Sequence, residues 1–169
     1  MSIDLAVRLT RPVRLASLLA GTERALQYIL ELPRGPSVHA EDYLRREPLK
    51  GSAVLESQSG SIKVAMKSYE DDPVFLFVSE RGGDPITSEG RGTFAVVEVH
   101  GGSVGLVLAA AVAVALAREC KSEIEDNRPY FSSDFEQSSD KFLMAIKGIN
   151  VNENLRLAVA ELRRSIAKG

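Results

Sequence analysis

The sequence predicts an α+β fold in which an antiparallel sheet of five or six strands carries its helices mainly on one face. Segments with a two-residue apolar period gather in the middle of the chain, and segments with a helical period lie toward its ends. Short turns join the strand-like segments, which favours antiparallel pairing. The expected order, roughly β-α-β-β-β-β-α-β-α-α, lacks the regular alternation of a parallel α/β fold.

Length and composition set the first limits on organisation and function. A chain of 169 residues predicts a single globular domain over 1–169, long enough to bury a core without disulfides or a metal. One cysteine, Cys120, cannot form an internal disulfide, which fits a reducing compartment. The first residues lack the basic region and apolar run of a signal peptide, so we expect a cytoplasmic protein. The net charge of −2 argues against a nucleic-acid binder.

The N-terminal part predicts one strand followed by helix. Apolar residues alternate with polar ones from Ile3 to Leu9, the pattern of a half-buried strand. Thr10 can cap a helix whose first turn tolerates Pro12. Gly21-Thr22 is expected to divide this helix into two pieces. The segment 37–50 is expected to be mostly irregular.

The middle of the chain predicts strands near 53–57, 62–67, 74–78 and 93–99. In the second of these, larger apolar residues alternate with Lys63, Ala65 and Lys67, so one face should be buried and the other wet. The third is a continuous apolar run, which indicates a central strand.

Two further helices are expected near the C-terminus. The first should begin at Ser138 or Ser139, which can cap it, and should end at Gly148. Asn150 or Asn152 can cap the second, whose apolar residues then recur at steps of four, three and four.

The stretch VEVHGGSVGLVLAAAVAVALAREC, from Val97 to Cys120, predicts a strand, a glycine turn and a buried helix. Its uncharged part, 105–117, falls short of the roughly 20 residues that span a bilayer, so no membrane segment is expected. Dense alanine favours helix over strand, and a helix that is apolar nearly all round is normally buried. Ser103 is the expected N-cap.

The glycine turn offers an alternative anion site, because a helix start presents free N–H groups and a favourable dipole. The residues of this site would be His100, Gly101, Gly102 and Ser103, with His100 as an acid or base toward a small anionic substrate. Their spacing matches neither the dinucleotide-binding nor the phosphate-loop pattern, so a purely structural turn is the preferred interpretation.

Other catalytic groups are not expected. A helix from Ser103 to Glu119 would be about 25 Å long, which keeps His100 and Cys120 apart. Cys120 follows a helix C-terminus, where the dipole disfavours a thiolate. His39 has no assignable partner, so neither a metal nor a cofactor is predicted.

An acidic stretch from Glu119 to Asp140 contains two basic residues and two adjacent aromatic ones. Such a run is often only solvated surface. The functional alternative is a docking face in which carboxylates steer a cationic partner and aromatic rings anchor it. A calcium loop does not fit the spacing of the acids. The residues predicted to bind this partner are Glu123, Glu125, Asp126, Tyr130, Phe131 and Asp134.

These observations predict a small, soluble, non-catalytic binding domain of the bacterial cytoplasm. It would dock a cationic protein through its acidic and aromatic face, as an adaptor or toxin-neutralising protein does. One alternative is an enzyme or anion-binding protein that uses the glycine turn. Another is a homo-oligomeric structural protein.

Overall fold

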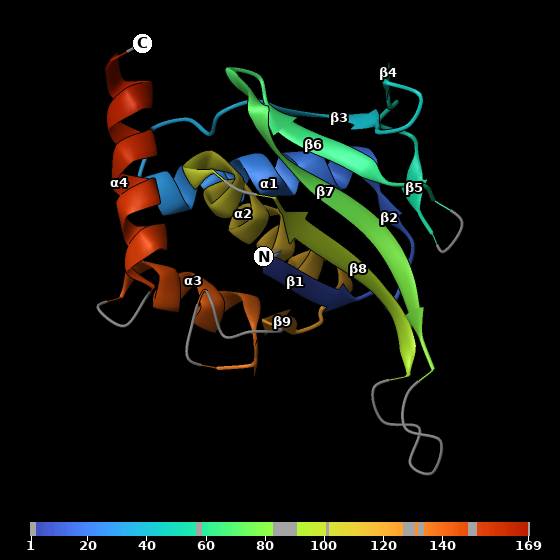
Figure 1. Cartoon of the computed structure of the whole chain (residues 1–169). Helices are drawn as coiled ribbons and strands as arrows, with labels where there is room; N and C mark the ends of the chain where they lie inside the picture. The colour runs from blue at the N-terminus through green and yellow to red at the C-terminus, as the bar shows by residue number, and fades with distance from the viewer. Residues whose placement is uncertain are drawn as a thin grey trace.

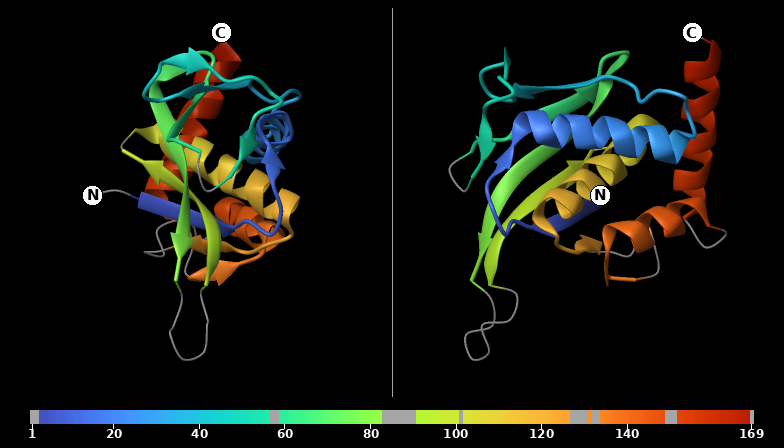
Figure 2. Two further views of the ribbon diagram at one scale, coloured as in Figure 1. Left: turned by 90° about the vertical axis from the view of Figure 1, so that its right-hand side faces the viewer. Right: turned by 180° about the vertical axis from the view of Figure 1, so that it is seen from behind.

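The fold is α+β, and its described residues form four helices, one eight-stranded antiparallel sheet and a separate two-stranded sheet. This computed structural model describes residues 3–56, 59–82, 91–100, 102–126, 131, 134–148 and 152–168. The main sheet has the order β10-β9-β1-β8-β7-β6-β3-β4. Figure 1 shows its central strands in front of two stacked helices, and the reverse view in Figure 2 places those helices in front of the sheet.

The strands differ greatly in length. The longer ones are β1 (Ile3–Arg8), β3 (Val38–Asp42), β6 (Ile62–Met66), β7 (Tyr69–Arg81) and β8 (Gly92–Val99). The shorter ones are β4 (Glu47–Pro48), β9 (Ile124–Asp126) and β10 (Glu136–Gln137), with β2 (Val13–Arg14) pairing β5 (Val54–Leu55) in the small sheet. The sheet therefore has more strands than the five or six expected. Strands β2, β4 and β10 have two residues each and are too short to display a two-residue period, and β3 lies in a segment expected to be irregular.

One continuous helix, α1 (Leu15–Leu30), replaces the two expected pieces. A Cβ atom added at Gly21 would lie 3.0 Å from the Cβ atom of Ala115 on α2, so this glycine allows the two helices to approach closely. The Thr22 hydroxyl donates to the Leu18 carbonyl of the same helix. Neither residue interrupts α1, and the expected break is wrong.

The helix α2 (Ser103–Cys120) is the centre of the core, as its sequence predicts. Fourteen of its residues are buried, and it contacts α1, α4 and strands β1, β7 and β8. It is long and apolar enough to cross a membrane by length and hydropathy, but most of it is covered by the rest of the protein, as in the core helix of a soluble domain.

Helices α3 (Ser139–Lys147) and α4 (Glu153–Lys168) follow the expected signals. The Ser138 hydroxyl accepts from the Lys141 N–H, and Gly148 is the C-cap of α3. The Asn152 side chain accepts from the Asn154 N–H at the start of α4. In Figure 1, α4 stands across one end of α1 and α2.

Candidate functional site

The sheet face opposite α1 and α2 is the most distinctive surface of the protein. We call it the open face, because no helix of the described part of the chain packs on it (Figure 2). Its members alternate along the strands with core residues and lie side by side by register. They are Asp4, Ala6 and Arg8 on β1; Phe94, Val96 and Glu98 on β8; Phe75, Phe77, Ser79 and Arg81 on β7; Lys63 and Ala65 on β6; His39 and Glu41 on β3; Glu125 on β9; and Glu136 on β10.

An aromatic groove occupies one part of the open face, with a volume of about 630 Å³. The rings of Tyr43 and Phe75 meet edge to face, with centroids 4.9 Å apart and planes at 77°. Phe75 meets His100 in the same manner, at 5.0 Å and 84°. The groove is lined by Tyr43, Ser61, Phe75, Phe77, Glu98 and His100.

Carboxylates surround the aromatic groove. Glu98 lies across from Phe75 in the β7–β8 register, and its Oε2 is 3.3 Å from His100 Nε2. On β1, Asp4 is the register partner of Glu98, so a second carboxylate lies on the same face. Lys63, the β6 neighbour of Phe75, is 3.0 Å from Glu41. The only described lysine beside the groove rings is thus already paired with a carboxylate of this chain.

A second hollow, of about 550 Å³, lies farther along the open face. There the Arg81 guanidinium lies over the Phe94 ring, 4.1 Å from its centroid, and contacts Glu125 at 2.5 Å. Beneath Arg81 and Phe77, a small apolar cluster of Ala6, Phe94 and Val96 is buried. This arrangement is a cation–π contact combined with an ion pair.

One acidic residue of the second hollow, Glu136, has a raised pKa. Loss of hydration and the nearby Glu123 and Glu125 carboxylates raise the pKa of Glu136 above its usual value. Register places Glu136 opposite Glu125 on β9. Among the described residues, no group of three or more histidine, cysteine or acidic side chains has the geometry of a metal site.

The predicted acidic docking face is only partly on this surface. Glu123 and Glu125 line the second hollow, and Asp134 is exposed nearby in the chain. Asp126 and Phe131 are instead buried, and the Asp126 carboxylate accepts a hydrogen bond of 2.7 Å from the Phe131 N–H. Both residues were expected on the surface, and that expectation is wrong, because Phe131 packs against Phe142 and its N–H donates to the Asp126 carboxylate.

Tyr130, the other predicted anchor, lies outside the described residues. An exposed aromatic side chain is nevertheless present in this segment, at Phe135, which is 53% exposed and lines the second hollow. Only tertiary packing distinguishes Phe131 from Phe135. The Phe131 ring packs against Phe142 of α3, with ring centroids 5.9 Å apart and planes tilted by 48°.

The glycine turn leads into the start of α2, where the Asp72 carboxylate already binds a backbone N–H. Asp72 of β7 accepts a 2.9 Å hydrogen bond from the Val104 N–H. A Cβ atom at Gly102, whose φ is +83°, would lie within 1.9 Å of that carboxylate. Gly102 rather than Ser103 is the N-cap, and Ser103 begins the helix. Gly101 lies outside the described residues, and His100 faces the aromatic groove.

The Asp72 carboxylate of this chain therefore occupies the helix start at which the sequence offered an anionic ligand. The Asp72 carboxylate provides the negative charge that the α2 dipole favours. The spacing of the sequence gives no sign of this, because Asp72 comes from a strand 32 residues away.

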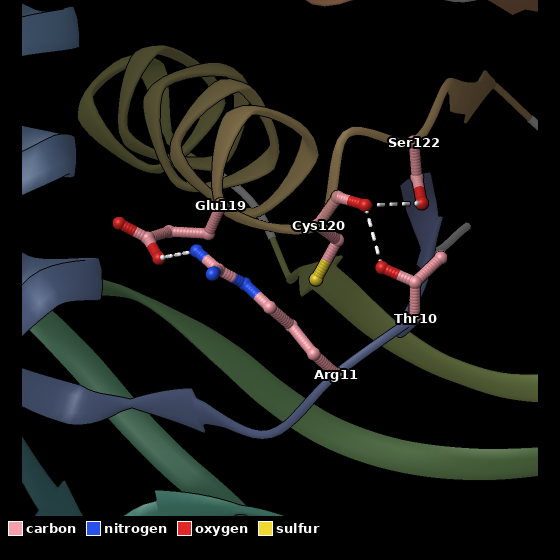
Figure 3. Close-up of polar contacts among 5 residues, drawn as sticks. All are labelled: Thr10, Arg11, Glu119, Cys120 and Ser122. Carbon is pink, nitrogen blue, oxygen red and sulfur yellow. Dashed lines mark hydrogen bonds and ion pairs between the residues drawn. The ribbon is translucent and has the colours of Figure 1, made fainter.

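Cys120 belongs to a structural junction at the other end of α2, drawn in Figure 3. Its side chain is buried, and its carbonyl accepts a 2.6 Å hydrogen bond from the Thr10 hydroxyl. Ser122 donates to the Arg8 carbonyl, and Arg11 pairs with Glu119 at 2.8 Å. These contacts fasten the end of α2 to the segment after β1.

The groove aromatics were not identified as functional from the sequence. The run from 74 to 78 predicts a central strand, and β7 does lie between β8 and β6, but only its even positions enter the main core. The residues on the neighbouring strands distinguish the open face from the covered face. Glu98 and Lys63 flank Phe75 in register, and both are charged.

No protein-family model matches the chain, and no curated protein or solved structure does. The site is therefore interpreted from its own geometry.

Proposed function

We propose that this protein is a binding domain that docks a basic protein partner on its open face. The observation that carries the proposal is the aromatic groove, where Tyr43, Phe75 and Phe77 remain partly or largely exposed on a sheet that a helix layer covers on its other side. Aromatic side chains are enriched in protein interfaces and among their energetic anchors.

The charge of the surrounding surface supports a basic partner. Carboxylates outnumber basic groups among the described residues that line the groove and the second hollow or adjoin them in register. The acids are Asp4, Glu41, Glu98, Glu123, Glu125 and Glu136, and the bases are Arg8, Lys63, Arg81 and Lys121. Complementary charge accelerates association and selects among partners more than it adds affinity.

Isolated exposed apolar residues also occur on the helical side, where they need no functional explanation. Tyr28, Met144 and Leu157 are exposed there, each on a different helix. The open face differs because its rings contact one another within a concave site bordered by carboxylates. This combination favours docking on the open face over the helical side.

The proposal is tested by capturing partners with tagged protein and identifying them by mass spectrometry. The open-face variant is Phe77→Ser/Glu98→Lys. The matched control is Leu157→Ser/Glu161→Lys, which removes an exposed apolar side chain and reverses an acid on α4. We expect a basic protein to be retained by the wild type and the control and lost by the open-face variant. Retention by both variants contradicts the proposal, and so does capture of only a second copy of the chain.

A further inference from the structure

We infer that the aromatic groove accepts one arginine side chain of the basic partner, with its guanidinium against the Phe75 ring and its charge paired with Glu98. This inference rests on the proposed docking function and specifies the group that the partner inserts. The same open face contains an internal example of the arrangement.

The internal example is Arg81. Its guanidinium lies 4.1 Å from the centre of the Phe94 ring and contacts the Glu125 carboxylate. The Arg81 side chain is only about a third exposed, so the contact is partly shielded from water. A planar guanidinium suits this position because it can stack on a ring while its N–H groups donate to a carboxylate.

The groove presents the same two groups, and none of the described residues that line it is an arginine. Phe75 and Glu98 are direct register partners on β7 and β8, so the ring and the carboxylate lie side by side. Tyr43 and His100 both meet Phe75 edge to face. The groove volume of about 630 Å³ is large enough for a side chain to enter.

The charged neighbours of the groove favour a guanidinium over an anion. Glu98 and Asp4 are adjacent in register, which concentrates negative charge beside the ring. Lys63 is paired with Glu41, 3.0 Å away. His100 is 3.3 Å from Glu98 and is an additional positive charge only when protonated. An arriving guanidinium can thus share the Glu98 carboxylate, which has two oxygens and accepts several hydrogen bonds.

The test uses NMR spectroscopy on the whole chain with two small probes. The first is Nα-acetyl-arginine N-methylamide, and the second is its citrulline counterpart, which keeps the shape but has no charge. We expect the arginine probe to shift the ring signals of Tyr43 and Phe75 in a saturable manner. A dissociation constant on the order of 10 mM is expected for one partly exposed cation site. The citrulline probe should leave these signals nearly unchanged.

Two variants locate the effect. Glu98→Gln should weaken arginine binding about threefold, the effect of one partly exposed ion pair. Glu161→Gln, on the exposed surface of α4, should have no effect. Equal shifts with both probes, an unchanged affinity in Glu98→Gln, or the absence of ring shifts at saturating probe would each overturn the inference.

The outcomes separate this inference from the proposed function. If the open-face variant loses its partner but the arginine probe does not bind the groove, only the arginine assignment fails. If the probe binds as described and no partner depends on the open face, the docking function fails while the groove remains an arginine site. Dilution-dependent ring shifts without any probe would assign the groove to a second copy of the chain and overturn the inference.

Discussion

The two faces of the large sheet are made from alternate residues of the same strands, yet their side chains serve different purposes. On the covered face, Leu5, Leu76 and Val97 are completely buried against the helices. On the other face, the neighbouring residues Phe75 and Glu98 form a partly exposed groove. Folding accounts for the covered face, since apolar area removed from water stabilises the native state. It does not account for aromatic rings left in contact with solvent on the open face.

The comparison also explains where the charged residues lie. On the covered side, the Asp72 carboxylate accepts a backbone hydrogen bond at the start of α2. On the open face, loss of hydration and the neighbouring Glu123 and Glu125 carboxylates together raise the pKa of Glu136. Grouping like charges costs stability, so a surface that retains them is a candidate for function.

The largest expected effect comes from truncating two adjacent residues of β7 whose side chains lie on opposite faces of the sheet. Leu76→Ala should lower the free energy of unfolding by about 2–5 kcal/mol, because the side chain is fully buried and its loss leaves a cavity. Phe75→Ala should cost less than about 1.5 kcal/mol, because the ring is already partly hydrated. Urea unfolding measures both values. Equal losses would show that the open face is as much a folding core as the covered one.

The next largest effect concerns the start of α2, the helix that covers the sheet. Asp72→Ala removes the acceptor of the Val104 N–H and should cost about 1–2 kcal/mol. Asp71→Ala, at the exposed neighbouring position, is the matched control and should be nearly neutral. Thermal unfolding at neutral pH compares them. If the two variants have the same melting temperature, the Asp72 hydrogen bond does not stabilise the start of α2.

The other end of α2 depends on the junction in Figure 3. Thr10→Val removes the hydrogen bond to the Cys120 carbonyl and should destabilise the protein by about 1 kcal/mol. Thr10→Ser keeps the hydroxyl and should restore most of the loss. Chemical denaturation measures both variants. A Thr10→Val variant as stable as the wild type would show that the Thr10 hydroxyl does not stabilise this junction.

The smallest effect comes from the open-face carboxylates. Glu136→Gln removes repulsion from Glu123 and Glu125, so the variant should melt slightly higher than the wild type at neutral pH. Folding raises the pKa of Glu136, so the wild type gains stability relative to the variant as the pH falls through that raised pKa. The difference should therefore vanish in acid. Melting curves across this pH range test the sign, and a variant that is less stable at neutral pH would contradict it.

The sequence predicted the elements whose periodicity is long or whose caps are explicit. The helix α2, the Ser138 cap and the Asn152 cap are confirmed, because each depends on local chemistry. Strands β2, β4 and β10 were missed, since no period can appear in two residues. The unbroken α1 was missed for another reason: Gly21 serves a contact with Ala115 that only the tertiary structure creates.

The candidate site was harder to predict than the fold. Alternation along one strand identifies two faces but does not say which face the helices cover. Phe131 and Phe135 are four residues apart in a stretch of similar composition. Phe131 is buried because it packs against Phe142 of α3, whereas Phe135 is exposed. The groove joins Tyr43 and His100 through Phe75 between them, a juxtaposition that depends on sheet order.

The docking of a basic partner on the open face is tested most directly by two tyrosines with equal exposure. Tyr43 on the groove and Tyr28 on α1 are each 49% exposed. Hydroxyl-radical footprinting with mass spectrometry measures the oxidation of each ring, with and without the captured partner. The account predicts strong protection of Tyr43 and unchanged oxidation of Tyr28. Protection of Tyr28 with Tyr43 unchanged would place the partner on the helical side and contradict the account.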